Sequence, residues 1–180
     1  MEDLSLHILD IAENSISAGA NRIEIRILED IKKDFFSMEI KDNGKGMSQE
    51  ILEKVTDPFY TTRTTRKVGL GLPFLSQSAK EAGGDLSITS NEGKGTTVYA
   101  YFKHSHIDRK PLGNIVDTLI VLIFGNPDID FFYEHKRNNN TYSIDTKEIK
   151  LELGGVPISS SVVIEIIKKD IQNGLKSLGL

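Results

Sequence analysis

The sequence of 180 residues contains no cysteine and no surplus of positive charge. Without cysteine the chain can form no disulfide and can offer no thiolate to a metal, which fits a reducing compartment, and we expect a cytoplasmic location. Its 22 lysine and arginine residues are outnumbered by 26 aspartate and glutamate residues, which gives a net charge of −4. Because the basic footprint of a nucleic-acid-binding surface is missing, we expect no nucleic-acid partner.

The sequence also lacks a long apolar run. The first residues, Met1-Glu2-Asp3, have neither the basic start nor the apolar stretch of a secretory signal. The longest mainly apolar run, Ile115 to Phe124, is interrupted by Asp117 and Thr118, and it falls short of the roughly 20 residues that cross a bilayer as a helix. We therefore expect no membrane association.

What is present is the composition of an ordinary soluble protein, 38% hydrophobic and 27% charged. Apolar residues that recur every three to four positions predict helices, and apolar residues that alternate predict strands. Up to residue 103 the expected elements are a helix over 4–18, strands over 22–28 and 36–42, a short helix over 48–55, a helix over 71–82 and strands around 86–88 and 98–102. This order predicts an α+β fold with a layer of helices on a mixed sheet.

The character of the chain changes after Lys103. The pattern then predicts a connector over 105–114, a buried helix over 115–124, a hairpin with strands at 129–135 and 141–144, and a long helix over 159–178. We therefore divide the chain into a first domain, residues 1–104, and a C-terminal α+β extension, residues 105–180.

A polar stripe follows the first expected helix. At 100° per residue, His7, Asp10 and Asn14 fall within about 60° of one another, beside the apolar face of the same helix. Such a stripe is most often the solvated side of an amphipathic helix. The alternative is that it lines a binding site.

A glycine-rich turn follows the second expected strand, with the sequence Asp42-Asn43-Gly44-Lys45-Gly46. The carboxylate can accept a hydrogen bond from an exocyclic amino group, and glycines allow backbone to approach a flat ring closely. By itself the pentapeptide is more simply interpreted as an ordinary glycine-rich turn.

A second glycine motif, Gly69-Leu70-Gly71-Leu72-Pro73, enters a helix. Amides at a helix N-terminus attract anions, and glycines expose those amides to a phosphate chain. The motif lacks the Gly-Lys-Ser/Thr of a Walker loop, and it is also compatible with a helix start selected for its turn geometry.

Two loops complete the set of candidates. Residues 57–67 carry Arg63, Arg66 and Lys67 among several hydroxyl side chains, which could close over phosphates. Residues 93–97, Gly-Lys-Gly-Thr-Thr, join two expected strands. A mobile surface loop and a plain hairpin turn are the simpler interpretations of these two segments.

The order of these motifs over residues 4–103 resembles that of the GHKL ATPase superfamily, which includes DNA gyrase, MutL proteins and histidine kinases. The resemblance implies a two-layer α/β sandwich of the Bergerat type, with a mixed, mostly antiparallel sheet, that binds ATP with Mg²⁺. It implies that Asn14 binds the metal, because its amide oxygen is a suitable ligand for Mg²⁺. It also implies that Asp42 binds the adenine amino group beside Gly44 and Gly46. It further implies that Thr96 supports the adenine.

The resemblance also assigns the phosphate end of the site. The segment Gly69-Leu70-Gly71-Leu72 matches the motif whose amides hold phosphates, and residues 57–68 match the ATP lid. Arg63 and Lys67, together with Arg66, are candidates to reach the terminal phosphate, and nothing in the sequence ranks them.

Asp10 lies one helical turn before Asn14, where gyrase-like and MutL-like proteins carry a glutamate that activates water. A shorter carboxylate there implies a general base or a residue near the magnesium, and we expect slow hydrolysis because geometry limits a general base before its pKa does. For His7 we expect a structural role. The first motif begins within a few residues of Met1, so the helix that carries the phosphoacceptor histidine of a sensor kinase is not expected.

The tail resembles the segment that follows the ATP motifs in MutL-type ATPases, and it is similar to that of small stand-alone ATPases encoded near iron-hydrogenase genes. Three functions remain open: an ATPase switch with a protein partner or a second copy as a homodimer, a kinase acting on another chain, and a non-catalytic nucleotide sensor that uses the 159–178 helix as its partner site. All three would use the same ATP site.

Overall fold

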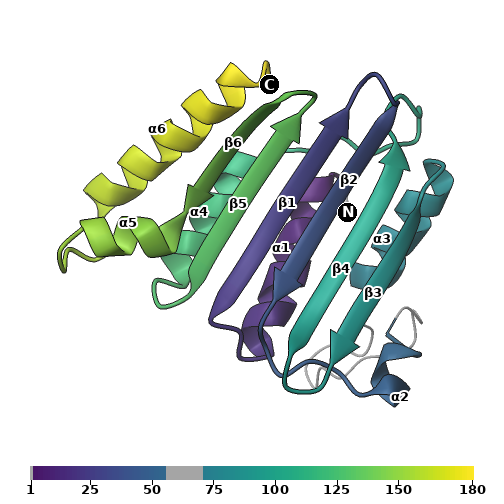
Figure 1. Cartoon of the computed structure of the whole chain (residues 1–180), viewed down its shortest axis with the longest axis horizontal. Helices are drawn as coiled ribbons and strands as arrows, with labels where there is room; N and C mark the ends of the chain where they lie inside the picture. The colour runs from purple at the N-terminus through teal and green to yellow at the C-terminus, as the bar shows by residue number, and fades with distance from the viewer. Residues whose placement is uncertain (1, 56–70) are drawn as a thin grey trace.

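The computed structural model describes residues 2–55 and 71–180 and contains one six-stranded sheet (Figure 1). The strand order across the sheet is β3-β4-β2-β1-β5-β6. The strands are β1 (Arg22–Asp30), β2 (Phe35–Asp42), β3 (Asp85–Asn91), β4 (Gly95–Lys103), β5 (Asp130–Arg137) and β6 (Asn140–Asp145). Neighbours run antiparallel except β1 and β5, which are parallel. The predicted α+β fold with a mixed, mostly antiparallel sheet is confirmed.

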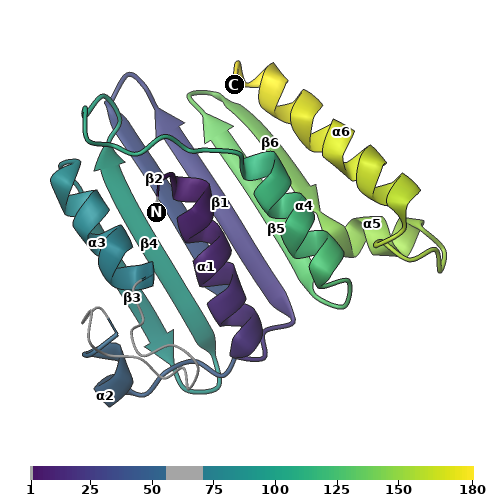
Figure 2. The same ribbon diagram turned by 180° about the vertical axis from the view of Figure 1, so that it is seen from behind.

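Helices form the second layer. Figure 2 shows α3 (Gly71–Glu81), α1 (Leu4–Ser17) and α4 (Ile115–Gly125) lying across one face of the sheet. The remaining helices, α2 (Gln49–Leu52), α5 (Thr146–Glu152) and α6 (Ser161–Ser177), lie toward the margins of the sheet, α2 near β3 and the other two at the β6 edge. The long α6 packs against both α4 and β6.

Alternation along the strands decides which face is covered. In β1 every second residue is buried, and Ile23, Ile25 and Ile27 point at the helices. Between them stand charged residues on the opposite face, where Arg26 pairs with Glu24 at 2.7 Å and with Glu39 on β2 at 3.2 Å. This period of two is what allows one sheet face to carry the core and the other to carry cross-strand ion pairs.

The C-terminal hairpin belongs to the same sheet as the first four strands. β5 pairs with β1 from Arg22 opposite Asp130 to Glu29 opposite Arg137, and β6 forms the edge of the sheet. A parallel neighbour needs a crossover connection, and α4 leads from the first half of the chain into β5. The ladder between β1 and β5 crosses the predicted boundary at residue 104. The division of the chain into two domains there stays a prediction.

Four details differ from the sequence-based expectations. The helix α5 was not expected, and α2 ends at Leu52 rather than at Val55. The helix α4 buries only one side, since Val121 and Phe124 are more than half exposed. On α6, Ile166 follows the helical spacing of the buried residues but is 62% exposed. Burial depends on which neighbours a helix meets, and periodicity alone does not supply those neighbours.

Among the described residues no helix combines the length and the apolar character that spanning a bilayer requires.

A buried polar cluster closes the end of the sheet opposite Asp42. Glu29, which is 6% exposed, lies with its Oε1 2.8 Å from His135 Nε2 and its Oε2 3.1 Å from His104 Nε2. The Tyr133 hydroxyl lies 2.9 Å from Nδ1 of His135, and Nε of Arg137 lies 3.8 Å from Glu29. Burial opposes the charge on Glu29, but hydrogen bonds from His135 and His104 and the nearby Arg137 outweigh it and lower the pKa of Glu29 to about 2.

Replacing this carboxylate should change how stability depends on pH. Because the pKa of Glu29 is lower in the folded chain than its ordinary 4.5, its ionised form stabilises the fold above about pH 4.5, and that contribution is lost as the pH falls toward 2. We expect Glu29→Gln to unfold more easily at neutral pH by about 3 kcal/mol and to lose less stability than the wild type on acidification. Urea denaturation at several pH values measures both. The exposed Glu92→Gln is the control, and equal acid sensitivity in Glu29→Gln and wild type would contradict the assignment.

Candidate functional site

Helix α1 carries the polar stripe of the sequence into the middle of the helical layer. Leu4, Ile8 and Ala12 are fully buried against the sheet, which fixes the rotation of the helix. As a result Asp10 and Asn14 are half-buried at the side of α1 that faces α3. The amide Nδ2 of Asn14 donates a long hydrogen bond of 3.5 Å to Oδ2 of Asp10. The two side chains therefore form one polar unit, one helical turn apart.

His7 does not belong to a solvated face. It is 2% exposed, and burial lowers the pKa of its ring to about 4. The ring is thus neutral at physiological pH. The interpretation of the stripe as a solvated helix face is wrong at this position, and the burial of His7 agrees with the structural role expected for it.

Asp42 is the centre of the hydrogen bonds at the other end of the site. It closes β2, is 8% exposed, and accepts three hydrogen bonds from three different segments. Ser15 Oγ on α1 donates to Oδ2 at 2.7 Å, while the backbone amides of Gly44 and Thr96 donate to Oδ1 at 2.8 and 3.2 Å. The orientation of the carboxylate is therefore fixed by contacts across the whole site.

The glycines of the Asp42 turn bring backbone segments into close contact. Gly46 has a φ of 66°, and a Cβ there would lie 2.0 Å from the backbone oxygen of Asn91. Gly95, with a φ of 89°, would place a Cβ 2.0 Å from the backbone oxygen of Asp42. Both positions combine a left-handed conformation with a contact that leaves no space for a side chain, so glycine is required at each. Gly44 is buried beside Ala18 at the end of α1.

Ser90 connects the two turns that flank Asp42. Its hydroxyl accepts a hydrogen bond from the amide of Met47 at 2.8 Å, donates to the backbone oxygen of Gly95 at 3.0 Å, and lies 2.9 Å from the Thr96 hydroxyl. Thr96 is half-buried. The Asp42 turn and the start of β4 are therefore held together by side-chain hydroxyls as well as by backbone.

The start of α3 meets Asp10. A Cβ built on Gly71 would lie 1.8 Å from Oδ2 of Asp10, so the carboxylate touches the backbone at the helix N-terminus. The free amides and the positive end of the helix dipole gather there. Leu72, the next residue, packs against the core. This contact brings the first and third motifs of the sequence together.

Several predicted residues lie outside the described residues. These are Arg63, Arg66, Lys67, Gly69 and Leu70. Their roles in the lid and at the phosphates stay predictions.

Sequence reasoning did not find Ser15 or Ser90. Ser15 directly follows Asn14 and lies on the same helical face as Ile8 and Ile11. It is only 3% exposed, and a hydroxyl that is buried to this degree normally has a hydrogen-bond partner. Its signal was a polar residue on an apolar helical face. Ser90 had no signal, because its importance depends on the pairing of β3 with β4.

The carboxylate of Asp42 is buried without a counter-charge. Over residues 2–55 and 71–180 no ion pair involves Asp42. A carboxylate offers about four acceptor positions, and the three donors above leave about one, on Oδ2. Burying an unpaired carboxylate is costly unless it is well hydrogen-bonded. A neutral donor such as an exocyclic amino group would complete the set.

Two solved structures share this fold. The chain matches the N-terminal domain of a DNA repair protein with a TM-score of 0.56 and 21% identity, over 80% of this chain and 52% of that one. It matches the Aquifex aeolicus MutL ATPase domain complexed with ADP with a TM-score of 0.51 and 19% identity, over 78% of this chain and 63% of that one. At this level of identity the likeness establishes the fold alone.

Sequence comparison supplies the family. The chain is 31% identical over 110 residues to a sensor histidine kinase NtrY-like protein of Rickettsia conorii, which is 61% of this chain but 18% of that protein. The matching segment thus makes up less than a fifth of that relative's length. The family described as histidine kinase-, DNA gyrase B-, and HSP90-like ATPases matches residues 2–106, more than half of the chain. The expected GHKL resemblance is thereby confirmed, and the chain belongs to this family of ATPases.

Proposed function

We propose that this chain binds ATP with Mg²⁺ along α1, hydrolyses it slowly, and uses closure of the lid to control a protein partner. Family membership supports the binding of ATP. The observation that carries the proposal is the buried Asp42 carboxylate, which is oriented by Ser15 and two backbone amides and, among the described residues, keeps an acceptor position on Oδ2. It closes β2, and Ser15 links it to α1, the helix that also carries the polar pair Asp10 and Asn14.

Asp42 would accept the adenine amino group, beside the close backbone of Gly44 and Gly46. The hydroxyl cluster of Thr96 and Ser90 supports this role, because it fixes the strand start that donates to Asp42. Discrimination follows from the chemistry: a purine with an oxygen at that position would face a carboxylate with another acceptor. When the wrong ligand would leave a buried polar group of the site unpaired, the site rejects that ligand strongly.

Asn14 would hold the metal through its amide oxygen. Among the described residues no group of three or more histidine, aspartate or glutamate side chains is arranged to bind a metal. We therefore propose that most of the remaining ligands are phosphate oxygens and water, as is usual for Mg²⁺. The bound ion would neutralise phosphate charge. The backbone at Gly71, where α3 begins, would face the phosphates together with Gly69, Leu70 and Leu72.

Asp10 would act as the general base. In hydrolysis the oxygen of a water molecule bonds to the terminal phosphorus, the bond to the ADP oxygen breaks, and Asp10 takes the proton of the water. The contact of its carboxylate with Gly71 supports this role, since it holds Asp10 at the helix start where the phosphates would lie. The short aspartate side chain is the reason to expect slow turnover. Arg63 or Lys67 of the lid would meet the terminal phosphate.

A second candidate function is a kinase that transfers the phosphoryl group to another protein. It is favoured by the similarity to sensor kinases, including 46% identity over 57 residues to sporulation kinase C of Bacillus subtilis, which is 32% of this chain and 13% of that protein. Incubation with γ-labelled ATP and the proteins encoded beside this one distinguishes the two functions. Label on a neighbour favours the kinase, whereas release of free phosphate without any labelled protein favours the ATPase.

Nucleotide binding should depend on the Asp42 carboxylate. We expect Asp42→Asn to weaken ATP binding by about tenfold or more, because an amide places a donor where donors already point and loses a charge-assisted hydrogen bond. Isothermal titration calorimetry with ATP and Mg²⁺ measures this. Asp85→Asn, an exposed carboxylate at the start of β3, is the matched control. Unchanged affinity in Asp42→Asn would refute the adenine assignment.

Ser15 should contribute through Asp42 rather than by contacting the nucleotide. Ser15→Ala removes the 2.7 Å hydrogen bond to Oδ2, and we expect a loss of about 1–2 kcal/mol in unfolding free energy and weaker ATP binding. Ser17→Ala, at the exposed end of the same helix, should change neither quantity as much. The double variant Ser15→Ala/Asp42→Asn should bind ATP no more weakly than Asp42→Asn alone. Additive losses would mean that Ser15 acts independently.

Turnover should depend on Asp10 while binding does not. We expect Asp10→Asn to lower phosphate release by about a hundredfold, which is typical for the loss of a general base, with an ATP affinity close to that of the wild type. Glu13→Gln, exposed on the same helix, should retain full activity. If wild-type phosphate release does not exceed that of Asn14→Ala, the chain is not an ATPase and the hydrolytic proposal is wrong.

A further inference from the structure

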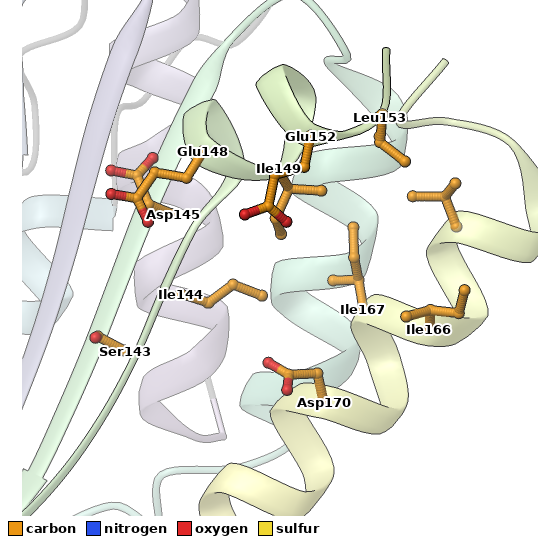
Figure 3. A pocket seen from close by; sticks show the side chains of 11 residues that line it. Ser143, Ile144, Asp145, Glu148, Ile149, Glu152, Leu153, Ile166, Ile167 and Asp170 are labelled. Atoms are coloured by element: carbon orange, nitrogen blue, oxygen red, sulfur yellow. The ribbon is translucent and has the colours of Figure 1, made fainter. Parts of the chain in front are cut away.

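A groove lies between the sheet edge and the last helix, far in the sequence from the nucleotide motifs. Figure 3 shows its walls, formed by β6, α5 and α6, and its volume is about 560 Å³. Its size is within the range of ligand sites, about 300–1,000 Å³. The floor is apolar and includes Ile144, Ile149 and Ile167.

The shape of the groove follows from how α6 is attached. Near its C-terminal end, α6 lies tight against β6, because a Cβ on Gly174 would overlap the ring of Tyr142 at 2.1 Å. The Tyr142 hydroxyl donates to Asp170 at 2.7 Å, and Arg137 donates to the backbone oxygen of Leu178 at 3.0 Å. The first half of α6 borders the groove with Val163, Ile166 and Ile167, and α5 and β6 supply most of the rest of its lining.

One apolar side chain at this groove is exposed without an intramolecular reason. Ile166 follows the helical spacing of the buried residues on α6, yet it is 62% exposed and lines the groove (Figure 3). Val162, one turn earlier, is 68% exposed. Large exposed apolar side chains beside a hollow of this kind are typical of a contact surface.

Carboxylates surround the apolar floor. Four acidic residues line the groove, namely Asp145, Glu148, Glu152 and Asp170, and no lysine, arginine or histidine does so. Asp145 is neutralised by Arg22 at 2.8 Å. Glu148 and Glu152 have no ion pair within residues 2–55 and 71–180. They stand one turn apart on a seven-residue helix, where two like charges oppose each other.

One lysine of each of these two helices is paired away from the groove, and the other lysines of α5 and α6 do not line it. Lys150 of α5 donates to Asp130 at 2.9 Å and to the backbone oxygen of Ile129, and Lys168 of α6 donates to Asp117 at 2.8 Å. The groove thus keeps unpaired negative charge next to exposed apolar surface. A ligand that brings positive charge on both sides of an apolar face would complement both features.

We propose that this groove binds a basic amphipathic segment of a protein partner, with apolar side chains in the groove and lysine or arginine side chains at Glu148 and Glu152. An amphipathic helix laid in an apolar groove is a recurring mode of recognition. The inference deepens the proposed function in that it names the surface and the chemistry of the partner. It does not require ATP to bind.

The test uses the full chain and a synthetic amphipathic helix of leucine and lysine, labelled with a fluorophore, at physiological salt. We expect saturable binding by fluorescence anisotropy. In NMR spectra of the isotope-labelled protein, the peptide should shift only the amide signals of β6, α5 and α6. Glu148→Gln/Glu152→Gln should weaken binding by about fivefold or more, which corresponds to the loss of two charge pairs of ordinary strength. Ile166→Ser should weaken it independently of charge.

A charge-matched double variant is the control. Glu81→Gln/Glu165→Gln removes the same two charges from exposed helix positions outside the groove, and it should alter the affinity less than twofold. The proposal is wrong if this control weakens binding as much, or if a scrambled leucine–lysine peptide without an apolar face binds equally well. It is also wrong if sedimentation shows a dimer of the wild type that Glu148→Gln/Glu152→Gln dissociates, because the occupant is then a second copy.

Calorimetry with ATP on the same variants separates this inference from the proposed function. Groove variants that bind ATP like the wild type but have lost the peptide support the groove and leave the nucleotide site intact. If the wild type binds the peptide but does not bind ATP, the proposed function is wrong and the groove proposal stands.

Discussion

The whole site depends on burying one carboxylate, that of Asp42, which has no counter-charge within residues 2–55 and 71–180. Asp42 is tolerated at the end of β2 because donors from α1, from its own turn and from β4 converge on it. Those donors can converge only because Gly46 and Gly95 allow backbone segments to touch where a Cβ would collide. The rotation of α1 is set in turn by its buried apolar face. A change in any of these parts leaves a buried carboxyl group with fewer hydrogen-bond partners, which is costly for the fold and weakens the candidate site.

The sheet carries two buried carboxylates that are handled in opposite ways. Glu29, at the far end of β1, is surrounded by His104, His135 and Arg137, so the protein itself supplies partners for its carboxylate. Within the part of the chain that the structure describes, Asp42 meets hydrogen-bond donors and no counter-charge. The first arrangement stabilises a structure and the second suits a binding site. Burial by itself does not distinguish them; the nature of the surrounding donors does.

The sequence predicted the features that are encoded locally. Periodicity identified five helices and all six strands, and the order of the glycine motifs identified the family before any contact was known. It did not identify the contacts that arise only after folding. Ser15 is significant because Asp42, 27 residues later, folds onto it, and His135 meets Glu29 across 106 residues through the parallel pairing of β1 and β5. The helix α5 was missed because seven residues hold too few turns for a clear period, and its cap, Asp145, resembles the end of a strand.

The arrangement of helices connects the proposed partner surface at the edge of the sheet with the proposed nucleotide site near its middle. The helix α1 carries Asp10, Asn14 and Ser15, α4 packs against α1, and α6 packs against α4, to which Lys168 ties it through Asp117. Packed helices transmit a displacement because close-packed interiors compress little. Contiguity alone does not make a switch, however; the ligand must bind one of two arrangements more tightly than the other. In this chain the end of α6 near Gly174 is wedged against Tyr142 while its first half borders the open groove. If a bound nucleotide displaced α4, the first half of α6 would be displaced with it, because Lys168 ties it to Asp117, and the width of the groove would change.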